Sequence, residues 1–169
     1  MSVLPIRLFP DPILRKPSKP ARWHESRLER FFKDLIETLR AQPGGIGIAA
    51  PQVGEGVRAI VVDVSPRDPS KQMELMINPI LCRLEGEILS REGCMSLPDY
   101  TANVVRAERV WVEWVDLKGR KHRKATSGIE AICLQHEIDH LNGFLFIDRV
   151  RSLKTDVFPR PKRPDRRIA

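Results

Sequence analysis

The sequence predicts a single domain that combines α helices with β strands, followed by a short basic tail. Helical periodicity near both ends of the chain and β-branched segments between them carry this prediction. The chain has 169 residues, which is enough for one domain with a real core and too few for two. We therefore place the domain at residues 1–150 and a proline-containing tail at residues 151–169.

The first third of the chain predicts an extended segment, a helix and a glycine-rich loop. Prolines at positions 5, 10, 12, 17 and 20 favour an extended path across a surface. Residues 25–40 repeat apolar side chains at the spacing of an amphipathic helix, which Pro43 stops. In the glycine-rich residues 44–56 the backbone can adopt positive φ and approach a ligand closely. Gln52 is the polar group of this loop, and its amide either donates a hydrogen bond into a site or holds the loop in place.

The middle of the chain predicts strands that lead into a second helix. Residues 88–90 lead into the REGCMSLPDY segment, and strand-like segments cover residues 57–64, 75–84, 110–117 and 120–126. Lys118 and Gly119 separate the last two of these, which indicates a β hairpin. A short closing strand is expected over residues 144–150. Prolines at positions 159, 161 and 164 forbid a continuous helix after it, so we expect a flexible tail.

The second helix carries the most informative segment, LQHEIDHLNG at residues 134–143. His136 and His140 are four positions apart, so on a helix they lie one turn apart on one face, where two imidazoles can hold one metal ion. Glu137 lies beside them and can take a proton from a water on the metal. The alternative is a buried helix whose two histidines are only hydrogen-bonded.

Capping signals set the limits of this helix. Ser127 and Glu130 have the spacing of a capping box, which predicts that the helix begins at Gly128. Gly143 is a natural left-handed terminator. Most positions between these limits are apolar, as in a helix buried on several sides.

A catalytic metal site needs a third protein ligand. One class of protease has a third histidine where this chain has Phe146, and no glutamate follows Glu137. Asp148 and Asp156 remain open as ligands. Cys94 is the better candidate, because a thiolate binds borderline divalent metals strongly, although such a cysteine taken alone is more often inert.

The composition fits a protein of a reducing compartment, and we expect a cytoplasmic monomer. The three cysteines are too few and too scattered for a disulfide framework, and the chain shows neither a membrane span nor a signal peptide. The net charge of +7 can steer a protein toward a polyanion such as RNA, so transient ribosome association through the basic surface is one expectation. A merely solvated basic surface explains the charge equally well.

Three segments, GIGIAAPQVG, EGCMSLP and QHEIDHLNG, resemble in order and spacing the signature motifs of peptide deformylases. The resemblance implies an α+β fold in which antiparallel β-sheets pack around a central HExxH-bearing helix, with an N-terminal amphipathic helix. It implies a metal-dependent hydrolase that removes the N-formyl group from the N-terminal formylmethionine of nascent polypeptides. It also implies one divalent metal ion, Fe²⁺ in the cell, which Zn²⁺, Ni²⁺ or Co²⁺ can replace in purified protein. Relatives often end in a basic helix that contacts the ribosome, and this proline-broken tail does not match it.

The resemblance also assigns site residues. The metal ligands are Cys94, His136 and His140, and Glu137 is the catalytic acid and base. The oxyanion donors are Gln52 and the backbone N–H of Met95, and Gly47 is a backbone contact to the substrate. The family usually has leucine where this chain has Ile48 and Met95, and both replacements remain apolar.

Supporting residues are assigned in the same way. Arg106 matches a family arginine that pairs with Glu92 and so supports the Cys94 loop, with a plain surface pair as the alternative. Asp139 either orients a ligand or contacts solvent. Helix face and loop proximity indicate an apolar pocket for the methionine side chain, made by Ile46, Ile129, Ile132 and Cys133.

The chemistry of these residue types agrees with the assigned roles. With Cys94 as thiolate and two neutral imidazoles, a divalent site carries a formal charge of +1 and still lowers the pKa of its water. Glu137 can accept a proton as that water attacks the formyl carbon, and can then pass it to the leaving amine, which releases formate. Two rival classes stay open: an HExxH peptidase that uses Asp148, and a basic RNA-associated protein whose metal is only structural.

Overall fold

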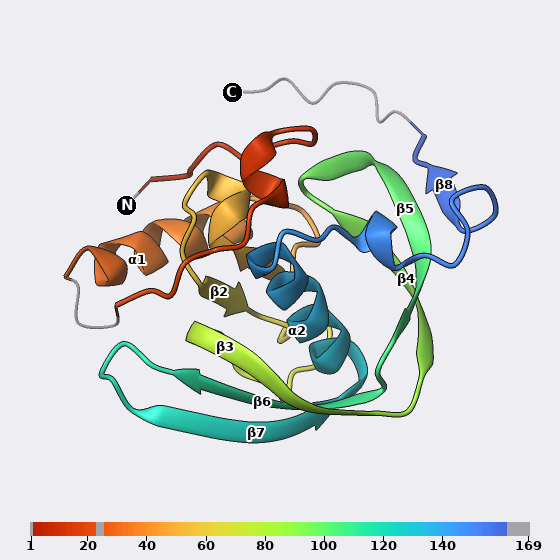
Figure 1. Cartoon of the computed structure of the whole chain (residues 1–169). Helices are drawn as coiled ribbons and strands as arrows, with labels where there is room; N and C mark the ends of the chain where they lie inside the picture. The colour runs from red at the N-terminus through yellow and green to blue at the C-terminus, as the bar shows by residue number, and fades with distance from the viewer. Residues whose placement is uncertain (1, 23–25, 162–169) are drawn as a thin grey trace.

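Helix α2 (Gly128–Leu141) lies at the centre of the computed structural model, which describes residues 2–22 and 26–161 (Figure 1). Two antiparallel sheets, helix α1 (Ser26–Arg40) and the N-terminal segment surround it. The predicted α+β class with a central motif helix is therefore confirmed. No helix of the described residues is long and apolar enough to cross a membrane.

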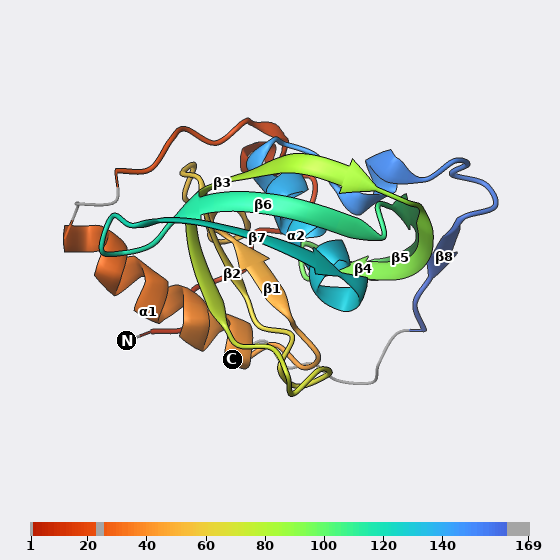
Figure 2. The same ribbon diagram turned by 90° about the horizontal axis from the view of Figure 1, so that it is seen from below.

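The larger sheet packs one face against α2. Its order is β1-β2-β3-β6-β7, with β1 at Gly47–Ala49, β2 at Ala59–Val62, β3 at Glu74–Glu85, β6 at Arg109–Val115 and β7 at Lys121–Ser127. Along β6, Val110, Val112 and Trp114 are buried in the cluster around α2, and the residues between them are more exposed. This period of two is that of a strand with one solvated face. Figure 2 shows β3, β6 and β7 side by side across α2.

Strand β2 is buried on both faces because a helix covers each of them. Ile60 and Val62 belong to the core cluster around α2, and Ala59 and Val61 belong to a second cluster under α1. From α1 this second cluster takes Leu28, Phe32, Leu35 and Leu39. The predicted amphipathic helix is therefore confirmed from Ser26 onward, and Glu25 lies outside the described residues.

The smaller sheet brings the middle of the chain beside α2. Its order is β4-β5-β8, with β4 at Ile88–Cys94, β5 at Leu97–Arg106 and β8 at Val157–Pro159. Over the part of the chain that the structure describes, β4 pairs only with β5 and β1 pairs only with β2. Each of these two strands therefore leaves one edge open, and β4 ends at Cys94.

The N-terminal segment is extended, as predicted, and closes over the C-terminal end of α2. Its one helical turn is the 3₁₀ helix η1 (Pro12–Arg15). The Ser18 N–H donates to the Leu141 carbonyl at 2.8 Å. Gly143 has φ of +81°, and a Cβ on it would lie 2.7 Å from the Arg15 carbonyl oxygen. The predicted terminator thus provides both a left-handed conformation and close backbone packing.

The predicted closing strand at residues 144–150 is wrong. A 3₁₀ helix, η3 (Phe146–Arg149), forms there instead. The Asp148 carboxylate accepts the Leu145 N–H at 2.7 Å, and the Asp148 N–H donates to the Leu145 carbonyl at 2.9 Å. These local bonds favour a turn over an extended chain.

The predicted capping box is also wrong, although α2 begins at Gly128 as expected. Ser127 makes no side-chain capping bond. The Glu130 carboxylate is instead bound by Thr126 and Lys124, so it is not available to the helix start.

Three strands were not anticipated in full from the sequence. Gly47–Ala49 pairs with β2 inside the segment predicted as a loop, and Leu97–Arg106 follows Cys94 where another loop was expected. Val157–Pro159 pairs with β5, so this part of the predicted flexible tail belongs to a sheet. Residues 162–169 of that tail lie outside the described residues.

Candidate metal centre

Helix α2 places two imidazoles side by side. The rings of His136 and His140 are one turn apart, with centroids 5.0 Å from each other. His140 is 1% exposed, and the His136 side chain is 11% exposed. The predicted arrangement on one helix face is therefore present in the structure.

Strand β4 brings Cys94 to the same point. Its sulfur lies 3.3 Å from His140 Nε2, and one donor atom from each of Cys94, His136 and His140 lies within 4.8 Å of the others. Asp148, the rival ligand, is bound instead to Arg15 and to the Leu145 N–H. Asp156 accepts the Ser152 N–H at 2.9 Å. Of the proposed third ligands, Cys94 alone belongs to the cluster.

The environment favours Cys94 as thiolate. Burial by itself would raise the pKa of the thiol, but the imidazoles of His140 and His136 more than offset it and hold the pKa well below its usual range. A thiolate with two imidazoles is a donor set that suits zinc, iron, nickel and cobalt. The three residues therefore fit a single divalent metal ion.

A buried chain of charges orients His136. Its Nδ1 lies 2.8 Å from Glu92 Oε2, which leaves Nε2 for the metal side of the ring. Arg106 holds the Glu92 carboxylate with two hydrogen bonds of 2.7 and 2.9 Å. Both side chains are about 5% exposed or less, so the interpretation as a plain surface pair does not hold. Burial would raise the pKa of Glu92, but Arg106 and His136 bring it down to about 2.

Asp139 extends this chain of charges away from the metal cluster. It accepts from Arg106 at 2.6 Å, and Arg149 donates to it at 2.6 and 3.1 Å. Of the two alternatives for Asp139, contact with solvent does not hold because the residue is buried, and any orienting of a ligand is indirect, through Arg106. Asp139 orients the Arg106 guanidinium, which in turn orients Glu92. The sequence offered no signal for the second partner of Asp139, Arg149.

Asp139→Asn is expected to weaken metal binding by about 10- to 100-fold, because it loosens the arginine behind Glu92 and His136. Metal affinity is measured by competition with a chromogenic chelator. Asp148→Asn is the matched control, since that carboxylate bonds Arg15 and the Leu145 backbone and should leave affinity unchanged. Equal metal affinity in Asp139→Asn and the wild type would contradict the role of Asp139.

Glu137 lies beside the cluster, and one of its two carboxylate oxygens has no hydrogen-bond partner among the described residues. Its side chain is buried, and Oε2 makes no hydrogen bond to the described residues. Burial raises its pKa to about 7, against the pull of His136 and His140. A buried carboxylate that titrates near neutrality is suited to moving protons.

Gly47 leaves the space that Glu137 occupies. A Cβ at this position would lie 2.6 Å from both Glu137 Oε1 and Cys133 Sγ. The sequence suggested a close approach of backbone to substrate, and the structure shows in addition that β1 approaches the glutamate.

Gly47→Ala is expected to lower kcat by about 10²-fold, since the added methyl group must displace the Glu137 carboxylate. Turnover on a formylated peptide, the substrate that the motif resemblance implies, measures the effect. Gly56→Ala is the control, because a Cβ there would meet only Ile13 Cδ1 at 3.7 Å. Wild-type turnover in Gly47→Ala would show that the carboxylate position is not critical.

Gln52 holds its own loop in place, one of the two roles considered for it, and also bonds Cys94 and Ser96, while its donation to an oxyanion stays a prediction. It lies in the 3₁₀ helix η2 (Ala50–Val53) directly after β1. Its Oε1 accepts the Ala49 N–H at 2.9 Å, and its Nε2 donates to Cys94 Sγ at 3.4 Å and to Ser96 Oγ at 3.3 Å. The amide N–H groups therefore point to the metal side of the loop. Ser96, whose N–H also lies 3.4 Å from the sulfur, was missed, although it stands two residues after Cys94 in the EGCMSLP segment.

The remaining predicted residues divide into two groups. Ile46, Ile129 and Cys133 pack in one apolar cluster, and Cys133 Sγ lies 3.4 Å from the Ile46 carbonyl. Burial raises the pKa of Cys133 well above its usual range, so this thiol stays neutral and apolar. Ile132 is half-buried and lies outside that cluster, and the Met95 side chain packs with the α1 cluster.

Comparisons with known proteins agree with this geometry. A family model described as polypeptide deformylase matches residues 3–156. The peptide deformylase of Thermodesulfovibrio yellowstonii is 43% identical over 158 residues, which is 94% of this chain and 95% of the relative. The peptide deformylase of Brucella suis is 42% identical over 93% of this chain and 90% of its own length.

Solved structures are similar over the same extent. A peptide deformylase from Legionella pneumophila has a TM-score of 0.83 and 38% identity, covering 90% of this chain and 88% of its own. A Met-Ala-Ser-bound class I type b peptide deformylase from Acinetobacter baumannii has a TM-score of 0.81 and 34% identity, covering 88% of this chain and 98% of its own.

Proposed function

The chain belongs to the polypeptide deformylase family, and from this premise we propose how its residues carry out deformylation. The activity is peptide deformylation, and the substrates are peptides that begin with formylmethionine. We assign Cys94, His136 and His140 to the metal, Glu137 to proton transfer, and Gln52 with the Met95 N–H to the oxyanion. The observation that supports this most directly is the cluster of three donor atoms within 4.8 Å beside the buried Glu137, whose Oε2 makes no hydrogen bond to the described residues.

The donor set fits a divalent metal ion, and we propose Fe²⁺ in the cell with Zn²⁺, Ni²⁺ or Co²⁺ as replacements. When bound, the ion lowers the pKa of a water and polarises the formyl carbonyl. The protein residues supply the remaining steps.

The open edges of β1 and β4 provide a place for the peptide backbone. The edge of β1 begins at Gly47, and the edge of β4 ends at Cys94. Gln52, which follows β1, donates to the Cys94 sulfur and so holds the ends of the two strands close together. An extended peptide can pair with an exposed strand edge through main-chain hydrogen bonds. The methionine side chain then enters the apolar cluster that includes Ile46, Ile129 and Cys133, with half-buried Ile132 as a further candidate at its border.

Proton transfer is assigned to Glu137. Its carboxylate accepts a proton from the attacking water, and the Gln52 amide and the Met95 N–H stabilise the charge that grows on the formyl oxygen. Glu137 then gives the proton to the leaving nitrogen as the C–N bond breaks. The products are formate and a peptide with a free N-terminal amine. Cytoplasmic peptides emerging from ribosomes are the substrate class that this chemistry serves.

A formate-release assay on formyl-Met-Ala-Ser under anaerobic conditions tests the proposal. Formate should form only in the presence of metal, should stop after chelation and should return when Fe²⁺ or Ni²⁺ is restored. Acetyl-Met-Ala-Ser is the control peptide, because it offers the same backbone with a larger acyl group. Elemental analysis of anaerobically prepared protein tests the assignment of iron. A metal-replete sample that released no formate would contradict the proposal.

A further inference from the structure

Two arginine side chains, one from β4 and one from the residue after β8, lie over the outer face of β4. Arg91 and Gly93 alternate with Glu92 and Cys94, so they belong to the face that points away from α2. Arg160, just after β8, lies over Gly93: a Cβ there would be 2.9 Å from its Cζ. The Arg160 backbone N–H donates to the Asp99 carbonyl at 2.7 Å, which anchors this residue beside the strand.

Neither arginine has a carboxylate partner among residues 2–22 and 26–161. The Arg91 guanidinium donates to Thr101 Oγ1 at 3.1 Å and to Asn103 Oδ1 at 3.0 Å, and its Cζ lies 3.6 Å from the centre of the Phe158 ring. Among the described residues, no acidic oxygen lies within 4.0 Å of Arg91 or Arg160. Both side chains are exposed. Within the described part of the chain no carboxylate neutralises either charge, so both can attract an anionic ligand, although Arg91 is also held by Thr101, Asn103 and Phe158.

The path proposed for the substrate passes these charges. With the formyl group at Cys94 and the backbone on the open edge of β4, the peptide runs antiparallel to the strand, past Gly93 toward Arg91. Side chains of an extended peptide alternate between faces. If methionine points to the apolar cluster, the next side chain points to the face that carries Arg160.

We propose that Arg160, together with Arg91, favours substrates with aspartate or glutamate in the two residues after formylmethionine. This inference rests on the proposed function of the site. A guanidinium can bind a carboxylate with two parallel hydrogen bonds. Because the pair is exposed, the expected preference is modest, about two- to fivefold in kcat/KM, and it should weaken as salt screens the charges.

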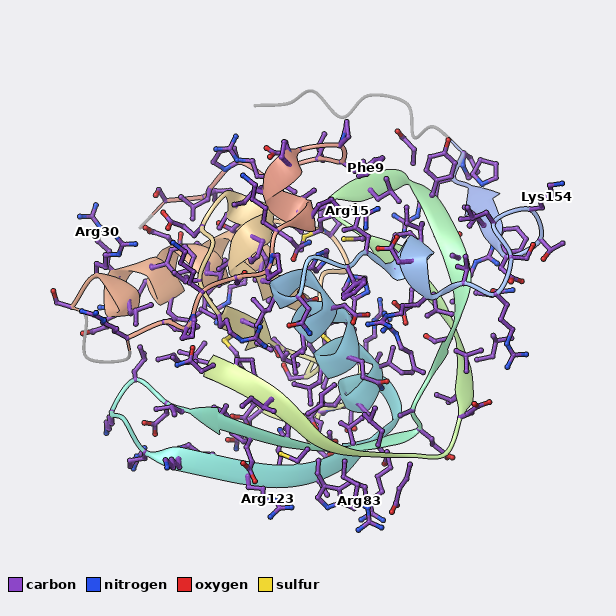
Figure 3. The ribbon with its side chains drawn as sticks, in the orientation of Figure 1. Phe9, Arg15, Arg30, Arg83, Arg123 and Lys154 are labelled. Carbon is purple, nitrogen blue, oxygen red and sulfur yellow. The ribbon has the colours of Figure 1, made fainter. Side chains whose placement is uncertain are left out.

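The test compares kcat/KM for matched peptide amides, in which the C-terminal carboxylate is absent. Formyl-Met-Asp-Ser amide is compared with formyl-Met-Asn-Ser amide, and formyl-Met-Ala-Asp amide with formyl-Met-Ala-Asn amide. The wild type should prefer aspartate at one or both positions at low salt. Arg160→Gln should reduce the preference toward one, and Arg160→Lys should keep most of it. Lys154→Gln is the control, since Lys154 projects into solvent at the edge of the molecule (Figure 3).

The outcomes separate this inference from the proposed function. Equal rates on aspartate and asparagine peptides in the wild type would overturn the role of Arg160, as would a preference that survives Arg160→Gln. An equal loss on all four peptides in Arg160→Gln would assign Arg160 a structural role instead. Absence of formate from every peptide would contradict the proposed function itself. The same comparison in Arg91→Gln measures how much of the preference for aspartate depends on the second arginine.

Discussion

Replacing Glu137 by glutamine is expected to lower formate release by about 10²- to 10⁴-fold while the fold and the metal are retained. The amide keeps the shape of the carboxylate but neither accepts a proton from water nor gives one to the leaving nitrogen. Glu92, the neighbouring carboxylate, is held by Arg106 and His136 and is not free to replace it. Steady-state turnover on formyl-Met-Ala-Ser measures the loss, and elemental analysis measures the metal.

Glu130→Gln is the matched control for this variant. Glu130 is also buried on α2, but it bonds Thr126, Lys124 and Lys71. Its replacement should lower the melting temperature and leave turnover of the remaining folded enzyme close to that of the wild type. Unchanged formate release in Glu137→Gln would remove this residue from the mechanism.

Cys94→Ser is expected to lose both metal and deformylase activity, with formate release reduced at least ~100-fold. Loss of a supporting residue already costs about 10- to 100-fold in metal affinity, and loss of a ligand should cost more. A serine hydroxyl stays protonated and binds soft or borderline metals poorly. Metal content and formate release are measured on the same preparation.

Cys82→Ser is the control, because Cys82 is exposed on β3 and is not one of the three clustered donor residues. A peptidase that used Asp148 as its third ligand would keep metal in Cys94→Ser and would cleave internal peptide bonds. Retention of metal at wild-type affinity would therefore contradict the ligand set proposed here.

Local patterns predicted those features whose signal is contained in a single element. The amphipathic helix at residues 26–40, the helix from Gly128 and the pair His136 and His140 each follow from spacing along one helix. The resemblance to three family motifs assigned Cys94 as the third metal ligand. Residue spacing alone had left Asp148 and Asp156 as alternatives to it. Strand β1 was missed because its three residues are held by pairing with β2, which the segment itself does not reveal.

Predictions failed where a side-chain hydrogen bond that residue spacing does not reveal decided the outcome. The strand expected near Phe146 became a 3₁₀ helix because Asp148 bonds the Leu145 backbone. The capping box failed because Lys124 and Thr126 hold Glu130. Arg149 could not be assigned from sequence, since its partner Asp139 also binds Arg106 and the arrangement exists only after the sheet and helix meet.

The N-terminal segment that closes over α2, here called the strap (residues 15–18), affects how a newly synthesised chain folds. These residues are synthesised early, but their partners Leu141 and Gly143 come more than a hundred positions later. During translation the strap must wait undocked until the last part of the domain has left the ribosome. Contacts between residues so distant in sequence slow folding. The metal-binding cluster of Cys94, His136 and His140 therefore forms late in folding, after α2 has been synthesised.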